Sequence, residues 1–133
     1  MTSQVRFYLQ SGVFFSMLSV VFGAFGAHAL KSLISIEMMD VFNTAIQYQI
    51  FHALGLIFLG LLMHLFADTD QQIKRFSIAG NLFLVGIILF CGSLYVLAIS
   101  GLKILGAITP LGGLAFIIAW LILLYGLLKT GEQ

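Results

Sequence analysis

Four long stretches of the chain contain no Asp, Glu, Lys or Arg, and the connections between them are short. These stretches are residues 7–30, 41–67, 76–102 and 104–128. A helix that crosses the hydrocarbon of a bilayer needs about 20 predominantly apolar residues, and all four stretches reach that length. The pattern predicts an all-α fold: one integral-membrane domain, residues 1–133, built as a four-helix up-and-down bundle.

Capping residues indicate where the helices begin. Ser35 can accept a hydrogen bond at the start of a helix over 36–66, and a polar connection separates that helix from a third one over about 72–100. Thr109 followed by Pro110 has the form of an N-cap and first helical position, which predicts a fourth helix over 110–128. Residues 101–108 are then an interfacial loop, and the alternative is one helix kinked at Pro110.

The first helix, expected over 7–30, carries small residues at intervals of three or four positions. They are Gly12, Ser16, Ser19, Gly23 and Ala27. Helices in lipid associate through close backbone contact at such residues. We therefore expect this face to pack against another helix of the bundle.

Composition supports a membrane location and excludes several other classes. Hydrophobic residues make up 61% of the chain and charged residues 8%, and the net charge is only +1, so no basic surface for nucleic acid is expected. The single cysteine, Cys91, excludes an internal disulfide. The segment from Arg6 to Ala29 has the outline of a signal peptide, but its apolar run exceeds the roughly 7–15 residues of a signal core, which favours a retained span.

Basic residues are divided unequally between the two ends of the predicted bundle. Arg6, Lys74, Arg75 and Lys129 lie at one end, and Lys31 and Lys103 lie at the other. By the positive-inside rule, this distribution places both termini in the cytoplasm.

Polar side chains within the predicted helices gather toward the end of the bundle that is opposite the termini. They are His28, Asn43, Thr44, Gln47, Tyr48, Gln49, His52, Ser93, Tyr95 and Thr109. Thr44, Tyr48 and His52 share one helix face, because they recur every four residues. Polar groups at this depth usually turn inward and find partners. We expect a hydrogen-bonded cluster around His52, Tyr48, Gln47 and Tyr95, with His28 as a further candidate.

The polar residues do not form a recognised catalytic or metal site. His28, His52, Glu37 and Asp40 lie near one connection, but no two of them have the i, i+4 spacing that holds a metal on a helix. The intramembrane serines lack an identifiable base. We predict no catalytic residues, no metal ligands and no cofactor.

Several short segments, taken in order, resemble a known family. They are GAFGAHAL at 23–30, YQ and HAL between Tyr48 and Leu54, GSLY at 92–95, and TPLGG at 109–113 followed by Trp120. This set is similar to the small bacterial inner-membrane proteins of the YgdD type, the "domain of unknown function 423" or UPF0382 family. Ala119 stands where a glycine is expected. The resemblance implies four membrane spans and supplies no established activity.

Two classes of function fit these observations, and an enzyme fits least. The first is a structural or accessory protein that docks other helices, with membrane lipids, a homo-oligomer or a larger complex as partners; Gly106, Gly113 and Trp120 recur every seven residues and could mediate self-association. The alternative is a binding or transport module for a lipid headgroup or small polar solute in the non-cytoplasmic leaflet. The candidate ligand-binding residues are His28, Gln47, Tyr48, Gln49, His52, Ser93, Tyr95 and Thr109.

Overall fold

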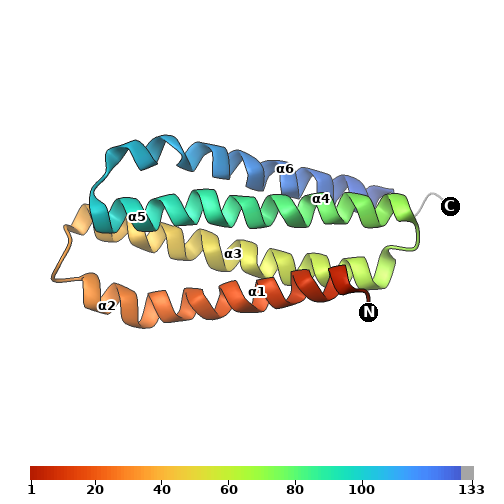
Figure 1. The fold of residues 1–133 in the computed structure, drawn as a ribbon, viewed down its shortest axis with the longest axis horizontal. Coiled ribbons are helices and arrows are strands. Elements are labelled where there is room, and N and C mark those ends of the chain that lie inside the picture. Colours follow the sequence, from red (N-terminus) through yellow and green to blue (C-terminus); the bar gives the residue numbers. More distant parts are fainter. Residues whose placement is uncertain (130–133) are drawn as a thin grey trace.

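In the computed structural model, residues 1–129 are described, and they form helices without strands. Four candidate membrane-spanning segments run Ser3–Leu30, Ile36–Phe66, Asp70–Ser100 and Lys103–Leu128. Figure 1 shows these four segments side by side, with the N-terminus and the end of the last helix at the same end of the molecule. The all-α, four-span architecture predicted from the apolar stretches is confirmed.

The first span begins earlier than the sequence predicted. Helix α1 covers Ser3–Val21, and the Oγ1 atom of Thr2 accepts a hydrogen bond from the backbone N–H of Val5, 3.3 Å away. The span continues through a π-helical segment, η1 (Phe22–Gly26), and a short helix, α2 (Ala27–Leu30). The prediction missed the first turn because polar and basic residues there lie outside the charge-free stretch.

The small-residue face of α1 packs against the second span. That span is helix α3, Ile36–Phe66, and it begins directly after Ser35, whose Oγ accepts from the N–H of Met38. A Cβ atom on Gly12 would lie 2.6 Å from the side chain of Ile57 and 2.7 Å from the carbonyl oxygen of Ala53. Only glycine allows this approach, and the expected packing face is confirmed.

The third span is interrupted by a second π-helical segment. Helix α4 covers Asp70–Gly86, η2 covers Ile87–Cys91 and helix α5 covers Gly92–Ser100. Thr69 and Gln72 form a capping box at its start, in which each side chain bonds the backbone of the other residue. The polar connection between the second and third spans therefore caps a helix.

The last span differs from the prediction at its start. A short 3-10 helix, η3 (Lys103–Ala107), precedes helix α6, which covers Thr109–Leu128 with Ile108 as the N-cap residue. Thr109 is helical and does not cap the helix, because its hydroxyl lies 2.8 Å from the hydroxyl of Ser93 and 3.2 Å from the carbonyl oxygen of Leu105. The expected interfacial loop over 101–108 is thus largely a helical turn.

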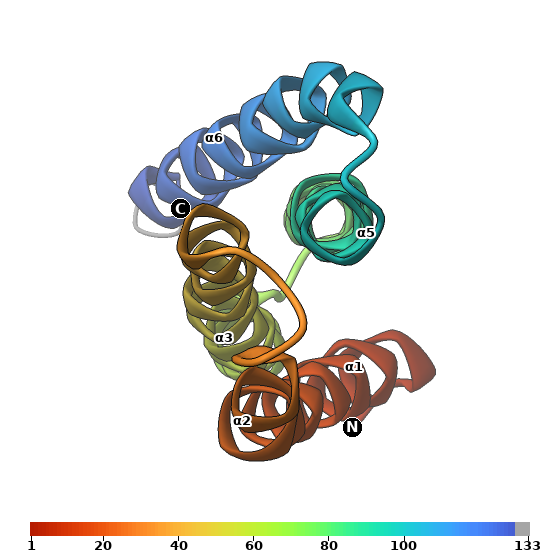
Figure 2. The same ribbon diagram turned by 90° about the vertical axis from the view of Figure 1, so that its left-hand side faces the viewer.

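The four spans do not close into a symmetric ring. Helices α1 and α6 lie on opposite sides of the pair formed by α3 and the α4–α5 span (Figure 2). Helix α1 packs mainly on α3, and α6 packs mainly on α4 and η2. The core between them is apolar and includes Leu56, Leu59, Phe76, Phe83 and Leu123, each less than 3% exposed. Because α6 packs mainly on α4, helix α3 lies closer to α1 on one side than it does to α6 on the other.

Candidate functional site

The polar residues singled out in the sequence lie in several separate places, although all belong to the parts of the helices that the sequence assigned to one end. His28 is exposed in α2 near the end of the first span. Gln49, Ser93 and Thr109 form contacts between helices, whereas Tyr95 of α5 packs against η1 and α3. Gln47, Tyr48 and His52 line a cavity on another face of α3. The expected single hydrogen-bonded cluster is therefore wrong.

The polar side chains of Gln49, Ser93 and Thr109 form hydrogen bonds between helices. Gln49 is only 2% exposed, and its Nε2 atom donates to the carbonyl oxygen of Phe15 in α1 at 3.0 Å. The hydroxyls of Ser93 and Thr109 join α5 to α6, and the Ser93 hydroxyl also donates to the carbonyl of Phe90. These residues hold helices together, and their polar groups are occupied by protein partners.

Tyr95 has no hydrogen-bonding role within the described residues. Its ring packs edge-on against Phe22 and Phe42, with centroids 5.0 and 5.1 Å away, and its buried hydroxyl has no partner there. Phe42 and His52 are ten positions apart on α3, which separates them by about 15 Å along the helix axis and by about 80° around it. This geometry explains why Tyr95 and His52 do not meet.

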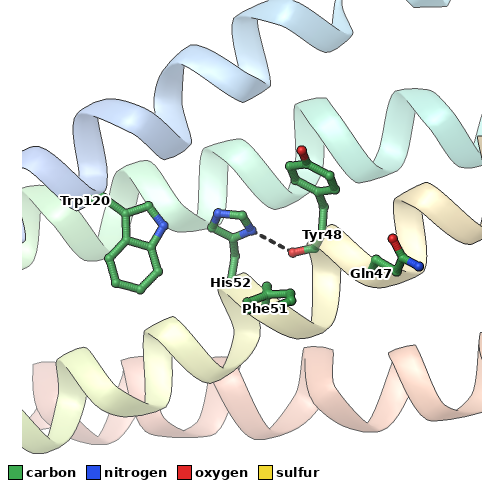
Figure 3. Close-up of a pocket in the computed structure, with 5 residues that line it drawn as sticks. All are labelled: Gln47, Tyr48, Phe51, His52 and Trp120. Atoms are coloured by element: carbon green, nitrogen blue, oxygen red, sulfur yellow. Dashed lines mark hydrogen bonds between the residues drawn. The ribbon is translucent and has the colours of Figure 1, made fainter.

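Gln47, Tyr48 and His52 line a cleft between α3 and α6. The cavity has a volume of about 310 Å³ and is lined by Gln47, Tyr48, Phe51, His52 and Trp120 (Figure 3), which places it at the lower end of the range of small-molecule sites. Both His52 and Trp120 lie near the middle of their helices. The cleft is therefore deeper along the span than a headgroup-level site.

His52 is the polar centre of this cleft. Its side chain is 7% exposed, and its Nδ1 atom lies 2.7 Å from the carbonyl oxygen of Tyr48, one turn earlier in α3. Because a carbonyl only accepts, Nδ1 carries the hydrogen of this bond. Within the part of the chain that is described, Nε2 has no hydrogen-bond partner, and Figure 3 shows it directed away from α3.

Aromatic rings fix the orientation of the imidazole. Phe116 of α6 stacks on it with centroids 3.4 Å apart and an interplanar angle of 12°. Phe83 and Trp120 lie at 5.8 and 6.2 Å, and Tyr48 stacks at 6.0 Å. With one ring face covered, the nitrogen-bearing edge is the part of His52 that a further molecule can reach.

Trp120 completes the cleft, and the sequence did not assign it to a binding site. Its indole ring passes over Gly55 of α3, where a Cβ atom would lie 3.3 Å from the ring, and it packs edge-on against Phe83 at 4.9 Å. Trp120 is still 40% exposed. One signal in the sequence was that Phe116 and Trp120 are four residues apart, and therefore share a face of one helix.

The chemistry that this arrangement supplies is hydrogen bonding and stacking. An imidazole nitrogen, an indole N–H and an amide face an aromatic-walled space. Among residues 1–129, no group of three His, Cys, Asp or Glu side chains could hold a metal ion. The described residues that line the cleft include no Asp, Glu, Lys or Arg.

Comparison with known proteins gives the family and no activity. Residues 22–113 match the family described as "Protein of unknown function (DUF423)", and this range contains all eight candidate residues but not Trp120. No solved structure matches the chain.

The chain is also similar to curated relatives along most of its length. It is 42% identical to the UPF0382 membrane protein YwdK of Bacillus subtilis over 94% of this chain and 98% of the relative. It is 41% identical to a UPF0382 membrane protein of Staphylococcus haemolyticus over the same shares, and 37% identical to one of Haemophilus influenzae over 84% of this chain and 85% of the relative. Together with the four apolar spans, these matches show that the chain belongs to the DUF423, or UPF0382, family of membrane proteins of unknown function.

Proposed function

We propose that this protein is a binding module that holds a lipid-soluble molecule in the cleft between α3 and α6. The observation that carries the proposal is the unpaired Nε2 atom of His52, a side chain that is 93% buried and borders a cavity of about 310 Å³. A polar group inside a membrane span usually has a partner, because the hydrocarbon offers none. A bound molecule would supply the partner that the described chain does not.

The position of the cleft favours entry from the lipid. Phe51 and Trp120 line it, and their side chains are 73% and 40% exposed. Both lie near the middle of their helices, where the surroundings are acyl chains. A molecule that partitions into the bilayer therefore reaches the site sideways, whereas a lipid headgroup would have to leave the interface.

Native mass spectrometry of the protein extracted in mild detergent tests this function. We expect the wild-type protein to retain a small molecule other than bulk phospholipid, and His52→Phe, which keeps a flat ring without nitrogen, to lose it. His64→Phe is the matched control, because His64 is exposed at the far end of the same helix. Equal retention by His52→Phe and wild type would contradict the proposal.

A structural or accessory role is the second candidate, and the contacts between helices favour it. The bonds from Gln49 to Phe15 and between Ser93 and Thr109 need no ligand. The self-association stripe expected on the fourth helix has less support: Gly106 lies in η3, Gly113 faces the ring of Phe90, and Trp120 lines the cleft. These three residues do not share one outward face.

We also propose that the protein lies in the bacterial plasma membrane with both termini in the cytoplasm. Four basic residues lie at the end of the bundle that holds the N-terminus and the end of α6, and two lie at the opposite end. Cytoplasmic connections carry the excess of Lys and Arg in helical membrane proteins.

A further inference from the structure

We propose that the molecule held in the cleft carries an aromatic hydroxyl group, and that this hydroxyl bridges His52 and Trp120. The inference deepens the function proposed above and rests on it, because it names the chemical class of the ligand. It depends on the hydrogen-bonding character of two ring nitrogens, on their mutual orientation and on the rings that surround them.

The acceptor is defined by the bond that His52 already makes. Nδ1 donates to the carbonyl oxygen of Tyr48, at 2.7 Å. In a neutral imidazole that donates through one nitrogen, the other nitrogen carries a lone pair and accepts. Nε2 therefore needs a donor, and no described residue provides one.

The donor is the indole of Trp120, since its Nε1–H can donate and cannot accept. No hydrogen bond involves this group among the described residues, where the ring of Trp120 lies near the rings of His52 and Phe83 and beside Gly55. Figure 3 shows the nitrogen-bearing edge of Trp120 turned toward His52, and the ring centroids are 6.2 Å apart. A donor and an acceptor thus face one space without bonding each other.

A hydroxyl group fits both requirements at once. Its oxygen accepts from the indole N–H, and its hydrogen is donated to the imidazole nitrogen. A carbonyl would serve only Trp120, and an ammonium group would serve only His52. An unpaired polar group at this depth is costly, so a ligand that satisfies both residues is favoured over one that satisfies either alone.

The walls of the cleft favour an aromatic carrier for the hydroxyl. Tyr48, Phe51 and Trp120 contribute ring faces and edges, and pairs of aromatic rings attract each other beyond the area that they bury. The volume of about 310 Å³ holds a small ring system, and an attached apolar tail would lie among the acyl chains. The geometry points to a phenol-type molecule dissolved in the membrane.

The test compares two probes that differ only in the hydroxyl hydrogen: para-octylphenol and its methyl ether. The protein, in lipid nanodiscs, is titrated with each probe while the emission of Trp120, its single tryptophan, is followed with excitation at the red edge of tryptophan absorption. We expect saturable changes with the phenol, and half-saturation by the ether at about a tenfold higher concentration, the effect of one lost hydrogen bond to a buried acceptor.

Two variants show whether His52 causes the difference in binding between the phenol and its ether. In His52→Phe, which keeps Trp120 as the probe, the phenol should lose its advantage over the ether; in His64→Phe, the advantage should match that of the wild type. Equal half-saturation of the wild type by both probes would overturn the hydroxyl bridge and leave the proposed function standing. An advantage that persists in His52→Phe would also overturn the bridge. Failure of both probes to saturate would overturn the bridge and count against the cleft as a binding site.

Discussion

His52 has two ring nitrogens in different surroundings, and this difference sets what the residue can do. One nitrogen is bonded to the preceding turn of its own helix, at 2.7 Å, which fixes the ring plane. Phe116 then stacks on the ring and holds it from α6. A side chain that is oriented from two helices and has one free polar atom is suited to recognition, because little reorganisation is needed when a partner arrives.

Two neighbouring glycines at the start of α6 give a prediction about stability. A Cβ atom on Gly112 would overlap the backbone nitrogen of Phe90, whereas one on Gly113 would lie 3.6 Å from the Phe90 ring, an ordinary contact. We expect Gly112→Ala to lower the free energy of unfolding by roughly 1–3 kcal/mol, as overpacking usually does. Titration of the protein in micelles with dodecyl sulfate measures this change.

Gly113→Ala is the matched control for that experiment. The same methyl group is added one residue later in the same helix, so any effect of helix propensity is shared by both variants. We expect Gly113→Ala to be as stable as the wild type or slightly more stable. Equal unfolding free energies for the two variants would mean that α6 does not approach η2 as closely as the structure has it.

At the scale of residues, the sequence predicted which way a side chain faces better than it predicted which residues that side chain contacts. The four-residue spacing of Tyr48 and His52 indicated a shared face turned inward; His52 is indeed buried, whereas Tyr48 is 43% exposed. The common depth of the polar groups led to Tyr95 being placed with them, but Tyr95 contacts Phe22 and Phe42 instead. Partners depend on how helices are rotated against one another, and the spacing within one helix does not contain that information.

At the scale of elements, the positions of the spans could be predicted, because lipid forces every apolar stretch of sufficient length into a helix. The span Ile36–Phe66 has the predicted bounds, and its cap is Ser35 as expected. The two π-helical segments, Phe22–Gly26 and Ile87–Cys91, were not predicted. An extra residue in a helical turn has no clear sequence signal, and it reorients the side chains that follow.

The start of the last span could not be predicted from the local sequence either. Thr109 and Pro110 read locally as a cap and a first helical position. The hydroxyl of Thr109 instead lies 2.8 Å from that of Ser93, which is 16 residues earlier in the chain. A contact between helices therefore overrides the local signal, and the helix begins at Thr109 itself.

At the scale of the whole molecule, the number of spans and their alternation follow from the sequence, but the open arrangement does not. Helices α1 and α6 lie on opposite sides of the central pair, and α6 leans on α4 (Figure 2). The cleft between α3 and α6 exists because α6 packs mainly on α4 and not on α3. Its lining residue Trp120 was consequently interpreted as an outward docking residue before the packing of α6 was known.

The proposed orientation can be tested by labelling introduced cysteines in intact cells with a maleimide that does not cross membranes. Leu33 and Gln71 are exposed in or beside connections at opposite ends of the bundle, and the natural Cys91 is buried. We expect Leu33→Cys to be labelled from outside, and Gln71→Cys to react only after the cells are permeabilised. The reverse pattern would place the termini outside.

The central claim is that the chain crosses the bilayer four times, with the His52 cleft near its middle. Trp120, the single tryptophan, lines that cleft near the middle of α6 and reports its depth directly. The measurement is quenching of its fluorescence in vesicles by phospholipids that carry bromine at successive positions along the acyl chain. The account predicts the strongest quenching by bromine deep in the chains, whereas strongest quenching by bromine next to the headgroup, or efficient quenching by aqueous iodide, would contradict it.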